Sequence, residues 1–234
     1  MLLTDKVAVI TGSVRGTGAG IARVFAREGA KVVINQVQDE GNPKQALEEI
    51  QAAGGQVLFV KADITNEAQV QDLVRQAEEQ FGQVDILVSN YAGGIPQKFF
   101  QETTWADWQH QLDTTVKAAF LCSQAVLPGM KTRRWGRIIS INTIGIHLPG
   151  PNYHAYTAAK TAMLGFTRNL AVEVGAYNIT ANIVSPGLTL TQEVKGVLTQ
   201  EAQEKHENRV PLRRTGTVED TANAALFSYY CAGW

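Results

Sequence analysis

Residues 11–18 read Thr11-Gly12-Ser13-Val14-Arg15-Gly16-Thr17-Gly18, and this glycine-rich stretch decides the fold. It follows a short apolar run and opens a helical pattern that ends at Gly29. Where side chains are absent, the backbone can turn tightly and approach a pyrophosphate, whose charge is favoured by the helix N-terminus. The stretch therefore predicts a dinucleotide-binding loop, with a glycine-rich turn of an unrelated α/β protein as the structural alternative.

Short apolar runs alternate with longer helical patterns along the rest of the chain. The runs are Lys6 to Thr11, Lys31 to Asn35, Gln56 to Lys61, Val84 to Ser89, Arg137 to Ile141 and Ile179 to Val184. Continuous apolar runs are typical of strands that are covered on both faces. Strand–helix–strand units with right-handed crossovers then build an open parallel sheet. The pattern predicts one α/β domain over residues 1–234, a single doubly wound parallel sheet of Rossmann type with helices on both faces.

Helix boundaries are marked by ordinary capping residues. Asn42 precedes Pro43, which suits an N-cap followed by the first helical position, and Asn66 with Gln69 resembles a capping box. These signals place helices between the second, third and fourth predicted strands.

Composition excludes several classes of function. A net charge of -1 and a pI near 6.4 give no positive field for nucleic acid. No run is long enough to cross a bilayer, and the N-terminus lacks the pattern of a signal peptide. Cys122 and Cys231 are far apart and suit a reduced compartment, so we expect a cytoplasmic protein. No metal is expected, because the four histidines lack metal-ligand spacing. They are His110, His147, His154 and His206.

The end of the second predicted strand bears on cofactor choice. An acidic residue there commonly accepts hydrogen bonds from the ribose hydroxyls of NAD, but this position reads Asn35-Gln36, both neutral. Arg15 in the glycine loop is placed to meet a 2′-phosphate. The balance favours NADP(H), with NAD(H) as the alternative because Asp39 and Glu40 follow closely.

A second carboxylate follows the third predicted strand. Asp63, in Lys61-Ala62-Asp63-Ile64-Thr65, is placed to accept a hydrogen bond from an adenine amino group. A loop or capping role is an equally good interpretation.

Tyr156 and Lys160 supply the candidate acid–base chemistry. Positions i and i+4 share a helix face, so the Lys160 ammonium lies near the Tyr156 phenol. Opposite charges about 4 Å apart at an effective dielectric near 20 interact by roughly 4 kcal/mol, or about three pKa units before desolvation. With the positive charge of an oxidised nicotinamide, Lys160 is therefore expected to bring the pKa of Tyr156 near neutrality. On its own, a tyrosine and a lysine at this spacing more often belong to a solvated helix face. In combination with the glycine loop, the pair indicates catalysis.

With these residues the chain resembles the short-chain dehydrogenase/reductase family from about Lys6 to Gly216. The matching motifs are Thr11-Gly12 with Gly16 and Gly18, Asp63, Asp85-Ile86-Leu87-Val88, Asn90-Tyr91-Ala92-Gly93, Tyr156 with Lys160, and Pro186-Gly187 with Thr191. The resemblance implies that Tyr156 is the acid/base, that Lys160 also holds the nicotinamide ribose, and that Thr191 meets the carboxamide. The predicted cofactor-binding set is Gly12, Arg15, Gly16, Thr17, Gly18, Asn35, Asp63, Asn90, Ala92, Gly93, Tyr156, Lys160, Pro186, Gly187 and Thr191.

The chain departs from the family pattern in four places. The family's catalytic serine falls on Thr143, whose hydroxyl can still donate to a substrate oxygen. The usual asparagine falls on Thr115, so a water relay from Lys160 must use a backbone carbonyl or this shorter hydroxyl. Asn90–Gly93 reads one residue longer than the usual Asn-Asn-Ala-Gly. Leu226 to Trp234 also ends without the last strand and glycine-rich tail, either naturally or because they were removed.

The basic cluster Lys131, Arg133, Arg134 and Arg137 has two interpretations. It is a solvated helix terminus, or it is a dock for acyl carrier protein as in the 3-oxoacyl carrier-protein reductases that the chain resembles. Tyr177 stands where those enzymes have a second basic residue, and this weakens the interpretation of the cluster as a dock for acyl carrier protein.

The sequence predicts an NADP(H)-preferring oxidoreductase that acts on a small-molecule carbonyl or secondary alcohol, with a 3-oxoacyl thioester as one candidate. Tyr156, Lys160, Thr143 and Thr115 are its predicted catalytic residues. A sugar or polyol dehydrogenase, a non-catalytic cofactor-binding regulator and a methyltransferase are the alternatives. A homodimer or homotetramer is expected, without nucleic acid or membrane partners.

Overall fold

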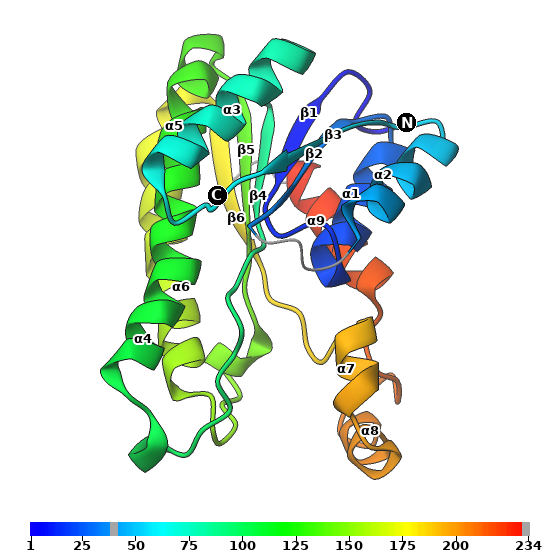
Figure 1. Cartoon of the computed structure of the whole chain (residues 1–234), viewed down its shortest axis with the longest axis vertical. Coiled ribbons are helices and arrows are strands. Elements are labelled where there is room, and N and C mark those ends of the chain that lie inside the picture. Colours follow the sequence, from blue (N-terminus) through cyan, green and yellow to red (C-terminus); the bar gives the residue numbers. More distant parts are fainter. Residues whose placement is uncertain (38–41, 231–234) are drawn as a thin grey trace.

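The computed structural model describes residues 1–37 and 42–230, and it is built on a six-stranded, all-parallel sheet in the order β3-β2-β1-β4-β5-β6 (Figure 1). The strands are β1 (Val7–Ile10), β2 (Lys31–Gln36), β3 (Gln56–Lys61), β4 (Ile86–Ser89), β5 (Gly136–Ile141) and β6 (Ile179–Val184). All six predicted strands and the doubly wound Rossmann-type sheet are confirmed.

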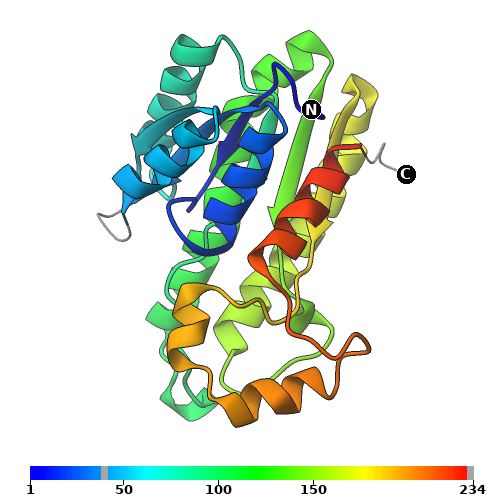
Figure 2. The ribbon, with the colours of Figure 1, turned by 90° about the vertical axis from the view of Figure 1, so that its right-hand side faces the viewer.

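Helices cover both faces of the sheet. One face carries α1 (Gly16–Arg27), α2 (Pro43–Ala52) and α9 (Val218–Tyr230), and the other carries α3 (Glu67–Phe81), α5 (Ala118–Arg133) and α6 (His154–Val174). The helix α4 (Trp105–Leu112) packs against α6. Between α4 and α5 lies a π-helical turn, Asp113–Lys117. The short helices α7 (Gln192–Val197) and α8 (Gln200–Glu207) lie beyond the main body of the sheet (Figure 2).

The core consists of two layers separated by the sheet. Successive side chains of a strand point to opposite faces, so Ala8 and Ile10 of β1 pack with α1 and α9, whereas Val9 packs with α3 and α5. Both layers are apolar, which is why the strands read as continuous apolar runs.

The predicted caps form largely as expected. The side-chain oxygens of Asn42 and Asn66 accept from the backbone N–H groups of Gln45 and Gln69, at 3.1 and 3.2 Å. Gln69 Oε1, however, accepts from the backbone of Asp63 at 2.7 Å rather than from its own N-cap.

The strand order reverses between β1 and β4, and this positions the site. The two strands are hydrogen-bonded neighbours, and the backbone N–H of Thr11 donates to the carbonyl of Val88 at 3.0 Å. A crevice forms outside the carboxyl ends of the strands at such a switch point. The glycine loop after β1 and Asn90 after β4 therefore meet there.

Some predictions fall on residues outside the described part of the chain. Asp39, Glu40 and Cys231 are among these residues, as is the final segment 231–234. Leu226 to Tyr230 belong to α9, and β6 forms one edge of the sheet in the described residues. No helix of residues 1–37 or 42–230 has the length and apolar character that crossing a membrane requires.

The packing of α1 on α9 gives a test of this arrangement. A methyl group added at Gly20 of α1 would collide with Val218 Cγ1 of α9. Helix propensity alone favours alanine by about 1 kcal/mol, but overpacking costs about 1–3 kcal/mol. We expect Gly20→Ala to lower the free energy of unfolding in urea, and Val218→Ala in the same chain to restore most of it.

Gly165→Ala in α6 is the matched control, because a methyl group there meets nothing within 4 Å. It should raise stability by up to about 1 kcal/mol. Gain of stability in Gly20→Ala would contradict the close approach of the two helices.

Candidate active site

The three glycines of the loop are required for different reasons. Gly12 and Gly16 have φ values of 60° and 56°, in the left-handed region that glycine adopts without strain. Gly18 has ordinary backbone angles, but a methyl group on it would meet the carbonyl of Gly12 and the amide nitrogen of Asn90. The loop is thus folded so tightly against Asn90 that only glycine fits at position 18. The exposed backbone of such a loop leaves room for a cofactor phosphate at the helix N-terminus.

Asn90 fastens this loop to the adjacent strand. Its Nδ2 donates to the carbonyls of Thr11 and Gly12, both at 3.0 Å. The Thr11 hydroxyl in turn accepts from the backbone N–H groups of Asn90 and Tyr91 at 3.0 and 3.1 Å. Asn90 therefore braces the predicted cofactor cradle with its side chain.

Asn35 occupies a different position from the one predicted. Its side chain is 1% exposed, and Nδ2 donates to the carbonyls of Val60 and Ala62 at 3.1 and 3.0 Å. Its backbone N–H donates to the Ser13 hydroxyl at 2.9 Å. The side-chain amide of Asn35 is thus buried and holds β3 to β2, and the predicted cofactor contact of this residue stays a prediction.

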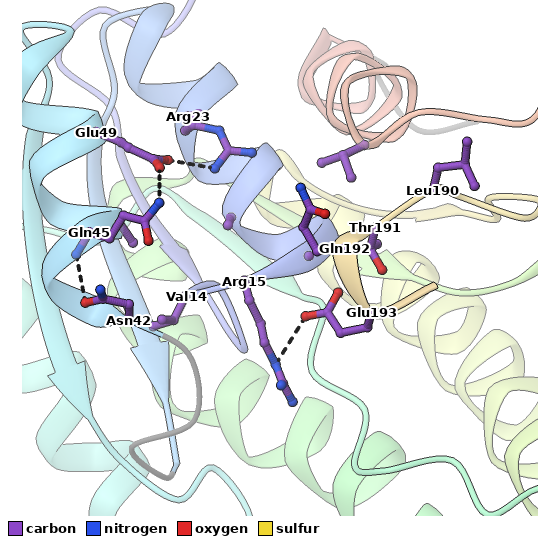
Figure 3. Close-up of a pocket in the computed structure, with 14 residues that line it drawn as sticks. Val14, Arg15, Arg23, Asn42, Gln45, Glu49, Leu190, Thr191, Gln192 and Glu193 are labelled. Carbon is purple, nitrogen blue, oxygen red and sulfur yellow. Dashed lines mark hydrogen bonds and ion pairs between the residues drawn. The ribbon is translucent and has the colours of Figure 1, made fainter. Parts of the chain in front are cut away.

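Arg15 belongs to the glycine loop, and Thr191 approaches this loop from the segment that leads into α7. Arg15 precedes α1, and its Nε is 3.6 Å from Glu193 Oε1 (Figure 3). The Thr191 hydroxyl caps α7 by accepting from the Val194 backbone at 3.3 Å, while its methyl group would lie 3.7 Å from a Cβ on Gly16. The structure thus brings Thr191 to the loop, with Thr17 in the first turn of α1, and the contact of Thr191 with a carboxamide stays a prediction.

Asp63 makes a local turn. Its Oδ1 accepts from the backbone N–H and the hydroxyl of Thr65 at 2.9 and 2.8 Å. This is the loop role that the sequence allowed, and the carboxylate remains partly exposed. An adenine contact is still a proposal.

The two loops that would flank the nicotinamide are held by backbone contacts. Gly93 is buried, and a methyl group there would meet His110 Nε2 and Thr114 Oγ1, while its neighbour Ala92 is partly exposed. The carbonyl of Pro186 accepts from the Ile144 backbone at 2.9 Å, which ties the Pro186–Gly187 turn to the segment after Thr143. A side chain at Gly187 would meet open space.

Tyr156, Thr143 and Lys160 come together as predicted. The Thr143 hydroxyl lies near enough to the Tyr156 phenol to lower its pKa, and it accepts from the Gly145 backbone at 3.1 Å. Lys160 Nζ is 5.8 Å from the centre of the Tyr156 ring. It donates to the carbonyl of Ile141 at 2.7 Å, while Asn142 Nδ2 donates to the carbonyl of Lys160 at 3.0 Å.

Without a cofactor, the pKa of Tyr156 is not lowered. Burial raises the pKa of the phenol above its ordinary value, the nearby Thr143 hydroxyl opposes this, and Tyr153 adds to the rise. The predicted lowering, which includes the positive charge of an oxidised nicotinamide, stays a prediction. Lys160 is 2% exposed, and burial lowers the pKa of its ammonium to about 8. Desolvation disfavours the charged form of both groups, and it outweighs the pairing that the i,i+4 spacing suggested.

Thr115 is not joined to this set. It lies buried in the π-helical turn, and its hydroxyl has no hydrogen-bond partner among the described residues. Lys160 instead uses the carbonyl of Ile141. A backbone carbonyl is thus the group beside Lys160, one of the two options that the sequence left open.

The basic cluster is occupied by internal contacts. Lys131 lies 3.5 Å from Glu173, and Arg133 and Arg134 donate to the carbonyls of Val84 and Ala176. Arg137 donates to the carbonyl of Tyr229 and stacks on Trp135. These contacts favour the structural interpretation over a protein dock. No group of three or more potential metal ligands occurs in the described part of the chain.

Sequence reasoning missed Glu193, the residue paired with Arg15. Its signal was the acidic side chain two positions after Thr191, which only the path of α7 brings to the loop. It also missed Ser13, whose hydroxyl donates to the carbonyl of Ile10 at 2.6 Å and so holds the start of the loop against the end of β1.

The switch-point cradle and the adjacent phenol define a nicotinamide-dependent oxidoreductase. A family model described as Enoyl-(Acyl carrier protein) reductase matches residues 12–228. The chain belongs to the short-chain dehydrogenase/reductase family. It is 36% identical over 225 residues to the 7alpha-hydroxysteroid dehydrogenase of Escherichia coli K12, covering 96% of this chain and 87% of that protein.

Other relatives are named for different substrates. The chain is 38% identical over 227 residues to the (2S)-[(R)-hydroxy(phenyl)methyl]succinyl-CoA dehydrogenase subunit BbsD of Thauera aromatica, covering 97% of this chain and 90% of that one. It is 31% identical over 223 residues to the 3-oxoacyl-[acyl-carrier-protein] reductase FabG of Staphylococcus epidermidis, covering 95% and 91%.

A solved structure shares the fold closely. The structure of 7alpha-hydroxysteroid dehydrogenase complexed with NADH and 7-oxo glycochenodeoxycholic acid matches with a TM-score of 0.91 and 36% identity, over 98% of this chain and 91% of that one. The chain is an NAD(P)-dependent dehydrogenase/reductase that transfers a hydride between a nicotinamide cofactor and a carbonyl or secondary alcohol.

The buried Lys160 gives a pH-dependent prediction. Its pKa is 10.5 when exposed and about 8 in the fold, so between these values the unfolded chain binds the extra proton and stability rises with pH. The ammonium therefore destabilises the fold below about pH 8, by up to about 3 kcal/mol. Relative to Lys160→Met, the unfolding free energy of the natural protein should increase from pH 8 to 10.5 in urea titrations.

Titrating both proteins in parallel cancels ionisations that they share. A difference that stays constant over this range would contradict the buried, desolvated placement of Lys160.

Thr115 gives a second prediction. Because its buried hydroxyl has no partner, Thr115→Val should leave the unfolding free energy unchanged or raise it by up to about 1 kcal/mol. Turnover should change by less than about tenfold, since a group that transfers the proton contributes about 10²–10⁴. A hundredfold loss of kcat without loss of stability would show instead that the hydroxyl carries the proton.

Proposed function

We propose that this chain is an NADP(H)-preferring reductase in which Tyr156 is the acid/base, Thr143 holds the substrate oxygen and Lys160 supplies positive charge beside them. The observation that carries the proposal is that the Thr143 hydroxyl lies close enough to the Tyr156 phenol to lower its pKa, with the buried Lys160 ammonium 5.8 Å from the centre of the Tyr156 ring. A single oxygen atom can accept from both hydroxyls, as a carbonyl in reduction requires.

The protonation steps follow from these groups. When bound, the nicotinamide supplies or accepts the hydride. In reduction, Tyr156 gives its proton to the substrate oxygen, and the raised pKa of the unliganded phenol suits a group that arrives protonated. Thr143 stabilises the same oxygen with a hydrogen bond, and the nearby Lys160 charge favours the phenolate that remains.

The residues of the cradle fit a dinucleotide. Gly12, Gly16 and Gly18 leave bare backbone at the N-terminus of α1, where an anion is favoured. Arg15 supports the preference for NADP(H), because a guanidinium binds phosphate well. Asp63 is proposed to meet the adenine, and the remaining proposed contacts are Thr17, Asn90, Ala92, Gly93, Pro186, Gly187 and Thr191.

Apolar side chains support a substrate with an apolar body. Phe99 and Phe100 are exposed on the segment between β4 and α4, and Leu148 is exposed on the segment between β5 and α6. Phe100 packs edge-on against His154 at 5.4 Å, at the start of the helix that carries Tyr156. Exposed apolar groups near a site support binding of an apolar ligand. They favour an acyl chain or ring ketone over a sugar or polyol, in keeping with the substrates for which the relatives are named.

Assembly and location belong to the same proposal. We propose a single-domain chain that forms a homodimer or homotetramer in the cytoplasm. The family resemblance supports the assembly, and the buried Cys122, whose thiol pKa burial raises to about 12, suits a reduced compartment. Acyl carrier protein gains no support from the basic cluster.

Tyr156→Phe tests the proposed function. With 3-oxoacyl thioester, steroid ketone and sugar substrates in turn, we expect oxidation of NADPH by the natural protein on an apolar substrate. The variant should lose at least about 10²–10⁴ in kcat while NADPH still binds in fluorescence titration.

Tyr153→Phe is the matched control, since its ring lies 6.3 Å from that of Tyr156 and is not proposed to transfer the proton. It should keep turnover within about tenfold, well below the effect of an acid–base group. Cofactor binding without turnover in the natural protein would favour the regulator, and turnover only with sugars would favour the polyol dehydrogenase.

A further inference from the structure

A polar cavity of about 580 Å³ lies beside the glycine loop (Figure 3). Its walls come from the start of α1, from α2, and from the segment 190–193 that leads into α7. Four charged side chains line it: Arg15, Arg23, Glu49 and Glu193. The two cations and two carboxylates balance, so this part of the cavity wall carries no net charge.

The two ion pairs differ in strength. Arg23 Nη1 donates to Glu49 Oε2 at 3.1 Å, and Gln45 Nε2 donates to Glu49 Oε1 at 2.9 Å, so this carboxylate is held from two sides. Arg15 Nε lies 3.6 Å from Glu193 Oε1, beyond an ordinary hydrogen bond. Both side chains are about half exposed, at 48% and 46%. The Arg15–Glu193 pair is therefore the one that a ligand can separate.

Glu193 also lies close to the loop backbone. Its Oε2 would be 3.8 Å from a Cβ on Gly16, the first residue of α1. An anion that approaches Arg15 thus meets the carboxylate of Glu193 before or beside the guanidinium. Repulsion from this carboxylate acts against a phosphate but not against a neutral hydroxyl.

We infer that Glu193 is a specificity-determining residue that competes with the 2′-phosphate of NADP(H) for Arg15. The inference rests on the proposed role of Arg15 as the contact of that phosphate. NADP(H) must displace the carboxylate from the guanidinium or tolerate it nearby. NAD(H), which lacks the phosphate, leaves the pair intact. Arg15 favours NADP(H), and Glu193 limits how far that preference goes.

The test is a comparison of NADPH and NADH dissociation constants by nicotinamide fluorescence. For Glu193→Gln, we expect NADPH to bind about two- to fivefold more tightly, the range that an exposed ion pair supplies. NADH should change by less than about twofold, since it places no phosphate near this side chain. The gain should shrink at about 1 M salt, because exposed charges are screened.

Glu49→Gln is the matched control. It makes the same change of charge in the same cavity, but Glu49 pairs with Arg23 and not with Arg15. The NADPH to NADH ratio should stay at the natural value. An equal tightening of NADPH in both variants would overturn the inference, because it would show a general field rather than competition for one guanidinium.

Arg15→Gln separates this inference from the proposed function. Selective loss of NADPH affinity in that variant supports the phosphate contact, and an unchanged ratio refutes it. In the double variant Arg15→Gln/Glu193→Gln, the effect of removing Glu193 should disappear if it acts through Arg15. Its persistence, or an unchanged ratio in Glu193→Gln while Arg15→Gln loses NADPH, would overturn the role of Glu193 and leave that of Arg15 standing.

Discussion

The side-chain amide of Asn90 holds the site together, because it donates to two successive carbonyls of the glycine loop across the switch point of the sheet. Loss of these bonds would remove the Asn90 donor from the carbonyls of Thr11 and Gly12 at the edge of the core. A carbonyl that is left buried without a donor lowers the free energy of unfolding by about 1–3 kcal/mol. The same contact forbids a side chain at Gly18. The bare backbone of the cradle is therefore a consequence of how β4 is fastened to β1.

Burial sets the protonation of Tyr156 and Lys160, the proposed acid–base pair. Placing Lys160 at the carbonyl of Ile141 removes its ammonium from water and lowers its pKa to about 8, so near neutral pH it is mostly charged but readily deprotonated. Tyr156 is held protonated by the same low-dielectric surroundings. A positive charge that arrives with an oxidised cofactor then acts on both groups where few water molecules screen it. The protein alone thus favours the proton-donating state.

Much of the fold was predictable because it depends on local pattern. Apolar runs gave all six strands, and Asn42 and Asn66 marked two helix starts with side chains that do cap. Positions of single side chains depended on the tertiary structure instead. Asn35 was assigned to the cofactor because it ends an apolar run. In the structure β2 extends one residue further, and the side-chain amide of Asn35 donates to the carbonyls of Val60 and Ala62. Nothing in the order of residues reports such long-range bonds.

The same limit applies to electrostatics, and it bears on how cofactor choice is controlled. Spacing showed that Tyr156 and Lys160 share a face, but not that desolvation would outweigh their attraction. Likewise, Arg15 stood out in the sequence while its partner Glu193 did not, since 178 positions separate them. Glu193 and Thr191 belong to one short segment against Gly16. A shift of α7 that moves the carboxylate from Arg15 would also move the threonine proposed to meet the carboxamide, so the proposed cofactor preference is coupled to the position of α7.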